Sequence, residues 1–142
     1  MQSHMLAPAA VLVLWSLVML IWLSIGRLPA LSKMGGIGKL PAGGRGLNLE
    51  GVLPDQVNWK SHNYTHLMEQ PTLFYAVSAI LAITGATVFD IRLAWGYVAL
   101  RIIHSVWQAM VNTVTVRMTL FSLSSILLLI LALRALAVTL LS

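Results

Sequence analysis

Long apolar runs separated by short polar joints dominate the chain. They predict four helices, at about residues 6–28, 58–85, 90–113 and 116–141. Each run reaches the roughly 20 residues that a helix needs to cross the hydrocarbon core of a bilayer. Residues 29–57, between the first two runs, are rich in glycine and include Pro29, Pro41 and Pro54, which is typical of a loop. The pattern therefore predicts a single domain of the all-α integral membrane class, a four-transmembrane-helix bundle.

Composition supports a lipid surrounding. Of the 142 residues, 58% are hydrophobic and 9% are charged, and the mean hydropathy is +0.86. A soluble domain normally carries about 25% charged residues, so this chain has too little polar surface to cover a globule in water. A cleaved secretory signal is disfavoured for the first run, because it is long, lacks a basic start and ends in Gly26-Arg27. The absence of cysteine excludes disulfides, thiolate nucleophiles and cysteine metal sites.

The basic residues predict the orientation in the membrane. A net charge of +5 and a pI near 10.3 would suggest nucleic acid in a soluble chain, but here we read them as topology determinants and expect no nucleic-acid partner. Five of the nine basic residues lie in or beside the first loop: Arg27, Lys33, Lys39, Arg45 and Lys60. The positive-inside rule then makes this loop cytoplasmic. Four spans place the start of the second helix and the end of the third at this same face.

Polar side chains form one stripe on each of two predicted helices. On the second helix, His62, His66 and Glu69 stand at positions i, i+4 and i+7, which is one helix face. The third helix has a similar stripe, within roughly 80° at 100° per residue, made of Arg101, His104, Gln108, Asn112 and Thr115. At 1.5 Å per residue, Glu69 and His104 lie about 16 and 18 Å from the cytoplasmic ends of their helices. The two stripes are therefore expected to meet.

Two consequences of this placement can be stated. We expect Glu69 to be ionised and to pair with Arg101 or His104 across the contact between the second and third helices, because a charge left in lipid costs about 2.5–3.5 kcal/mol. Pro71 removes a backbone donor, so the carbonyl of Leu67 is expected to be free to take part in a pocket.

The stripes allow more than one interpretation. An ionisable cluster inside a membrane predicts a functional site, whereas a Glu69–Arg101 pair could equally serve to hold the bundle together. A metal site built from His62, His66, Glu69 and His104 is disfavoured, because the H-E-x-x-H order and thiolates are both missing. The glycine-rich loop lacks the GxxxxGK[ST] order of a phosphate cradle.

A family resemblance rests on residues of the second and third helices. The string HLMEQP at 66–71 runs into LFYA and is followed by Trp95, Arg101-x-x-His104, Asn112 and Arg117. This order resembles the MAPEG family, the membrane-associated proteins in eicosanoid and glutathione metabolism, and its wording is closest to the bacterial branch. The resemblance covers about residues 6–140. It implies a homotrimer of four-helix protomers, here in a bacterial inner membrane, with glutathione as co-substrate between protomers near the cytoplasmic side.

The resemblance also implies roles for individual residues. Arg117 or Arg27 would be the catalytic residue that stabilises the glutathione thiolate, and Glu69 would bind the amino group of the tripeptide. The residues implied to bind glutathione or substrate are Lys60, His62, His66, Glu69, Arg101, His104, Gln108 and Asn112. A guanidinium beside a thiol stabilises its charged form, which suits that chemistry.

The chain departs from the family pattern at several of these positions. The family's Asn of the second helix is His66 here, the Arg one turn earlier is His62, and the Tyr residues of the third helix are His104 and Gln108. An imidazole does not bind a carboxylate through two parallel hydrogen bonds as a guanidinium does.

Three functions therefore remain open. The first is a glutathione-dependent transferase or peroxidase that acts on a lipophilic electrophile from the bilayer, and the second is a non-catalytic lipid-binding or scaffold protein of the same fold. The third is a small transporter subunit, which is weakened because the chain shows no inverted repeat or broken helix pair.

Overall fold

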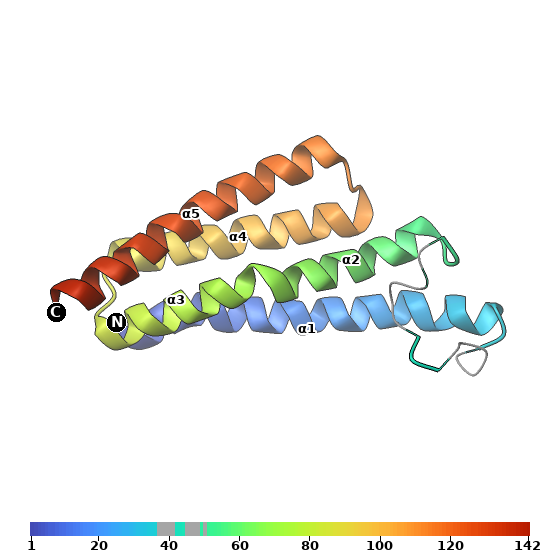
Figure 1. The fold of residues 1–142 in the computed structure, drawn as a ribbon, viewed down its shortest axis with the longest axis horizontal. Coiled ribbons are helices and arrows are strands. Elements are labelled where there is room, and N and C mark those ends of the chain that lie inside the picture. Colours follow the sequence, from blue (N-terminus) through green and yellow to red (C-terminus); the bar gives the residue numbers. More distant parts are fainter. Residues whose placement is uncertain (37–41, 45–48, 50) are drawn as a thin grey trace.

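The computed structural model is an all-helical bundle and describes residues 1–36, 42–44, 49 and 51–142. Its helices are α1 (Gln2–Lys33), α2 (Asp55–Glu69), α3 (Pro71–Thr84), α4 (Val88–Met110) and α5 (Val114–Leu141). Only Gln70 separates α2 from α3, and its backbone is itself helical, so the two form one rod and the chain folds into four rods (Figure 1). The predicted all-α class and four-helix count are confirmed. Lys39 and Arg45, which helped to predict the topology, lie outside the described residues.

The connections between helices lie at the ends of the bundle that bring the two polar stripes together. The long connection from α1 to α2 and the short turn between α4 and α5 lie at one end (Figure 1). The two chain termini and the turn between α3 and α4 lie at the other end (Figure 1). The prediction that the second helix starts where the third one ends is therefore confirmed. This arrangement brings the polar half of α2 beside the polar half of α4.

Three rods are long and apolar enough to cross a membrane: Gln2–Lys33, Asp55–Thr84 and Val114–Leu141. Among the described residues α4 does not meet that standard, so a fourth span stays a prediction. The standard rests on length and composition alone, and the packing of α4 shows where its polar residues lie. α4 contacts α1, α2 and α5, and its buried side chains include Asp90, Arg101, His104 and Gln108. These four polar groups therefore face the interior of the bundle, while Arg92, Trp95, Ile103 and Val106 are exposed.

The first two helices are longer than predicted, at the end of α1 and at the start of α2. α1 continues through Pro29 to Lys33, although the proline was expected to end it near residue 28. Leu31, beyond the proline, is buried against Leu49 and Leu53, and this contact favours continuation of the helix. α2 begins at Asp55 rather than at residue 58, and an acidic residue in a first turn suits the positive end of a helix dipole.

The boundaries of α4 and α5 also differ from the prediction. α4 starts at Val88 instead of residue 90, because Thr87 and Asp90 form a capping box. α4 ends at Met110 instead of residue 113, because Asn112 takes a left-handed backbone conformation with φ of 56°. Asparagine tolerates this conformation and often follows a helix end. α5 then begins at Val114 rather than at residue 116.

A polar contact fastens the bundle end that is remote from the stripes. The carboxylate of Asp90 is fully buried and pairs with the guanidinium of Arg134 on α5. Arg134 also donates a hydrogen bond to the hydroxyl of Thr87, at 3.2 Å. The turn between α3 and α4 is thereby fixed to the last turns of α5.

Candidate functional site

A small pocket forms where α2, α4 and α5 meet, in the half of the bundle near the α1–α2 connection. It is lined by His66, His104, Arg117, Met118 and Phe121 and has a volume of about 130 Å³. We call it the Arg117 pocket. The ring centroids of His66 and His104 are 5.5 Å apart, and the ring of Phe121 lies 5.7 Å from the first and 6.4 Å from the second. Two imidazoles and one aromatic wall therefore surround the space beside the Arg117 guanidinium.

Arg117 is held in place by the turn between α4 and α5. Its Nη1 donates a hydrogen bond to Oδ1 of Asn112, at 2.6 Å. Asn112 owes its position to the left-handed backbone that ends α4, and its own backbone N–H donates to the carbonyl of Trp107 at 2.7 Å. One asparagine thus both ends a helix and orients a guanidinium, which leaves the other guanidinium nitrogens for a ligand.

Arg101 lies behind the pocket and is fully buried. Its Nη2 donates a hydrogen bond to the backbone carbonyl of His66, at 3.2 Å, and its guanidinium lies 6.0 Å from the ring centroid of Phe121. Pro71 was expected to free the carbonyl of Leu67. The carbonyl that accepts from Arg101 belongs instead to the preceding residue, His66. Arg101 therefore joins α4 to the backbone of α2 beside the pocket.

The predicted ion pair of Glu69 is wrong for the single chain. Glu69 is exposed, and among the described residues the only ion pair within 4 Å joins Asp90 to Arg134. The buried face of α2 includes Asn63 and Leu67, and Glu69 lies about 120° around the helix from Asn63 at 100° per residue. Rotation of α2 about its axis, which the stripe alone did not define, leaves the carboxylate beyond ion-pair distance of Arg101.

Several buried polar atoms near the pocket have no hydrogen-bond partner in the described part of the chain. They are His66 Nδ1, Arg101 Nε and Nη1, His104 Nε2 and Gln108 Oε1. Native proteins leave few buried polar groups unpaired, so each one needs an explanation such as a ligand or water. Nitrogens predominate here, and the two unpaired Arg101 nitrogens are donors. The two Arg101 donors fit an anionic ligand, such as a carboxylate or a thiolate, whereas Oε1 of Gln108 can only accept a hydrogen bond.

The structure does not bring every predicted site residue to this pocket. His66, His104 and Arg117 line it, Asn112 and Arg101 contact its lining, and Gln108 is buried on α4. His62 is half-buried on α2 and is not among the lining residues.

The remaining predicted cations lie elsewhere. Lys60 lines a different cavity, of about 310 Å³, together with Trp22, Gln56, Ala109 and Met110. Its Nζ is 5.1 Å from the centroid of the Trp22 ring and donates to the carbonyl of Gln56. Arg27 is half-buried on α1 and lines neither cavity. In one chain, therefore, Arg117 is the catalytic candidate that reaches the two imidazoles.

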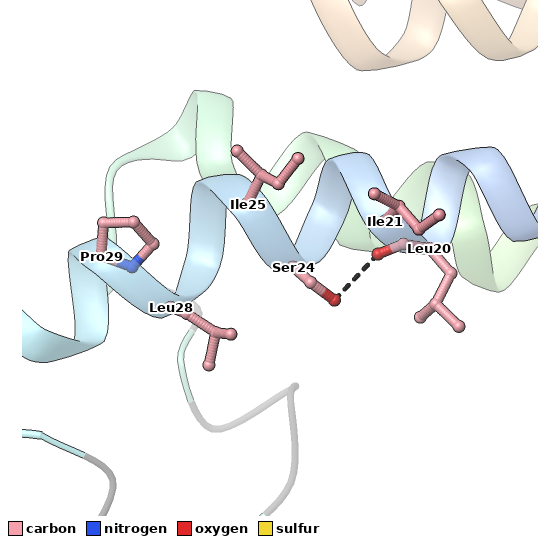
Figure 2. Close-up of a pocket in the computed structure, with 6 residues that line it drawn as sticks. All are labelled: Leu20, Ile21, Ser24, Ile25, Leu28 and Pro29. Atoms are coloured by element: carbon pink, nitrogen blue, oxygen red, sulfur yellow. Dashed lines mark hydrogen bonds between the residues drawn. The ribbon is translucent and has the colours of Figure 1, made fainter.

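A third hollow lies on the outer face of α1 (Figure 2). It has a volume of about 560 Å³, and its lining residues all come from α1: Leu20, Ile21, Ser24, Ile25, Leu28 and Pro29. The only hydroxyl is occupied, because Oγ of Ser24 donates to the carbonyl of Leu20 at 2.9 Å. This groove shares no residue with the Arg117 pocket, and its surface suits apolar chains.

Phe121 and Met118 are pocket residues that the two predicted stripes missed. A signal was present in the sequence: Phe121 stands at i+4 from Arg117, so the two residues share one helix face. The predicted stripes covered only the second and third helices, and no polar stripe was predicted at the start of the fourth.

Comparison with known proteins identifies the family. The family model described as MAPEG family matches residues 5–137, a range that includes α2 to α4, nearly all of α1 and most of α5. No curated protein and no solved structure matched the chain. The family includes glutathione transferases and peroxidases as well as non-catalytic members. Because the match covers almost the whole chain, and because three of its rods can span a bilayer, this multi-pass membrane protein belongs to the MAPEG family.

Proposed function

We propose that this protein is a glutathione-dependent transferase or peroxidase that acts on lipophilic electrophiles dissolved in the bilayer. The observation that carries the proposal is the Arg117 guanidinium, fixed by Asn112 at the mouth of a pocket with two imidazoles. A cation beside a thiol stabilises the thiolate, which is the nucleophilic form. His66, His104 and Arg101 supply further nitrogens for the carboxylates of the tripeptide.

The proposed chemistry balances without any further reagent. In the transferase reaction, the glutathione thiolate attacks an electrophilic carbon, a C–S bond forms, and the leaving group departs with its electron pair. In the peroxidase reaction, the thiolate attacks the outer oxygen of a hydroperoxide, which gives an alcohol and glutathione sulfenic acid. A second glutathione then condenses with the sulfenic acid to form the disulfide and water. Arg117 stabilises the attacking thiolate in both reactions.

Other copies of the chain are part of the proposal. Pockets that enclose small ligands have volumes of about 300–1,000 Å³, whereas the Arg117 pocket measures about 130 Å³. One chain therefore encloses only part of a tripeptide. Lys60 and the α1 groove, which share no lining residue with this pocket, would complete the site from a neighbouring copy. The homotrimer implied by the family resemblance would provide this, with Glu69 exposed for a ligand rather than paired.

The proposed location is a bacterial inner membrane, with lipid around the bundle and the first loop in the cytoplasm. Ser32, near the end of α1, and Ser142, at the chain terminus, are both exposed and lie at opposite ends of the bundle. We expect a cysteine at position 32 to react with a membrane-impermeant maleimide only after the cytoplasmic face is opened. A cysteine at position 142 is expected to react in intact spheroplasts. Labelling of both positions from the same side would contradict this topology.

The test of glutathione binding uses Glu69. We expect the purified trimer to bind glutathione in a calorimetric titration, and Glu69→Gln to weaken that binding by roughly tenfold to a hundredfold. This corresponds to the loss of a charge-assisted hydrogen bond to the ligand ammonium, about 1.5–3 kcal/mol. A des-amino analogue of glutathione lacks that ammonium, so its affinity should be the same for both proteins. Asp55→Asn, at an exposed acid on the same helix, is the matched control and should change neither affinity.

A second candidate function is a non-catalytic lipid-binding or scaffold protein. It is favoured by one observation: imidazoles of His66 and His104 occupy the pocket, and an imidazole cannot bind a carboxylate through a bidentate fork. Wild-type protein that binds no glutathione would make this function the better supported one. Equal losses for glutathione and the des-amino analogue on Glu69→Gln would assign Glu69 a structural role and point the same way.

A further inference from the structure

We propose that Gln70, which lies outside the Arg117 pocket, is a positioning residue for it. Its side chain links three rods through a chain of hydrogen bonds that ends at the backbone of Phe121, the aromatic wall of the pocket. We call this chain the Gln70 relay. The role in catalysis rests on the proposed function, whereas the structural part can be tested without a ligand.

The relay consists of three hydrogen bonds. The hydroxyl of Tyr97 on α4 donates to Oε1 of Gln70, at 3.2 Å. Nε2 of Gln70 donates to Oγ of Ser125 on α5, at 2.7 Å. That hydroxyl in turn donates to the carbonyl of Phe121, also at 2.7 Å. Gln70 thus accepts a hydrogen bond from α4 and donates one to α5. The α2–α3 rod is thereby joined to both helices at one level of the bundle.

The position of Gln70 explains why side-chain support is needed there. Gln70 stands between α2 and α3, and the following residue, Pro71, has no N–H to donate to the carbonyl of Leu67. The rod is therefore weakest at this joint. His66, a pocket residue, lies one turn before the joint and shares its side of the helix. The relay thus ties the weak point of the rod to the two helices that supply the other pocket residues.

The chemistry of the relay requires a carboxamide at this position. Oε1 accepts from one helix while Nε2 donates to another, and a neutral carboxamide offers an acceptor and a donor on two separate atoms. An ionised glutamate cannot donate to Ser125, and a leucine can do neither. Tyr97 is fully buried and its ring stacks on Phe74 with centroids 4.4 Å apart, so its hydroxyl is delivered to Gln70 by a rigid group.

The consequence for the site is a fixed aromatic wall. The ring centroid of Phe121 lies 5.7 Å from that of His66 and 6.4 Å from that of His104. Arg117 is one turn earlier on the same helix. Without the relay, α5 keeps its apolar contacts but loses its polar anchor to α2–α3 at the level of the pocket. We therefore expect the side chains of His66, His104, Phe121 and Arg117 to shift relative to one another. This shift should lower the affinity for the ligand more than it lowers the free energy of unfolding.

The experiment uses the full-length protein in detergent and variants along the relay. Gln70→Leu and Ser125→Ala are each expected to raise the KM for glutathione roughly tenfold, because two net hydrogen bonds of about 0.5–1.5 kcal/mol each are lost. Tyr97→Phe keeps the stacked ring and removes one bond, so a smaller rise is expected. Ser125→Thr keeps the hydroxyl and should restore the wild-type KM. The matched controls, Tyr64→Phe and Thr139→Val, remove hydroxyls outside the relay and should change nothing.

A ligand-free measurement separates the relay from the proposed function. The rings of His66 and His104 lie beside that of Phe121, so the NMR resonances of their imidazole protons depend on the ring current of that wall. We expect these resonances to move in Gln70→Leu and Ser125→Ala but not in Ser125→Thr or the controls. Wild-type protein that fails to bind glutathione would overturn the proposed function and leave this readout to decide the relay. Unchanged resonances in Gln70→Leu, or a loss of thermal stability alone, would overturn the relay.

Discussion

Replacement of Arg117 by alanine is expected to give the largest loss of activity. The protein should still fold, but the turnover of glutathione with chlorodinitrobenzene or cumene hydroperoxide should fall by roughly one to two orders of magnitude. The physical reason is the loss of the cation beside the thiol, which raises the pKa of the bound thiol and lowers the thiolate fraction at neutral pH. The measurement is the pH dependence of the rate together with the ultraviolet absorbance of the thiolate.

The pH profile also identifies the cause. Activity in Arg117→Ala should recover as the pH rises. Without the guanidinium the thiol has a higher pKa, so a higher pH restores the thiolate fraction. Arg117→Lys keeps a charge but loses the planar guanidinium, which donates to Asn112 and has further nitrogens for a ligand, so an intermediate rate is expected. Arg92→Ala removes an exposed arginine from the other half of α4 and is the matched control. A rate loss in Arg117→Ala that is the same at every pH would contradict thiolate stabilisation.

Replacement of Arg101 by methionine is expected to separate stability from function. Arg101 is fully buried, contacts no carboxylate within ion-pair distance in the described part of the chain, and leaves Nε and Nη1 unpaired. A buried charge without a counterion costs desolvation free energy, and apolar replacement of buried ionic groups is often neutral or stabilising, by about 1–4 kcal/mol. We therefore expect Arg101→Met to keep or raise the thermal stability of the protein while glutathione binding falls at least roughly tenfold.

A second arginine offers a control of opposite sign. Arg134 pairs with the fully buried carboxylate of Asp90, so Arg134→Met leaves that carboxylate without its cation. The expected cost is about 1–3 kcal/mol of stability, with glutathione affinity unchanged because the pair lies at the other end of the bundle. The stability of both variants is measured by thermal unfolding in detergent, and their affinity for glutathione by calorimetric titration. A large destabilisation by Arg101→Met would show that Arg101 acts mainly to hold the bundle together.

The correction at Glu69 shows the limit of a face prediction. Three residues of α2, His62, His66 and Glu69, were correctly placed on one stripe, but a stripe of that width spans more than one neighbour. The structure turns Asn63 and Leu67 to the bundle interior and brings His66 to α4 at one edge of the buried face, with Glu69 exposed. The pairing of Arg101 changed accordingly, from a carboxylate to the backbone carbonyl of His66. Periodicity gives the face of a helix, whereas the partner depends on how neighbouring helices are rotated.

The sequence by itself determined the membrane class, the four rods, the shared end of the second and third helices, and the family. These follow from local properties, since the length and apolarity of a segment decide whether it can enter a bilayer. Only the tertiary structure decided which polar residues meet. It placed Phe121 and Met118 in the Arg117 pocket, moved Lys60 to a separate cavity, and joined Gln70 to two other rods. Such contacts depend on the rotation and offset of packed helices, which side-chain packing across the whole bundle fixes and no single segment encodes.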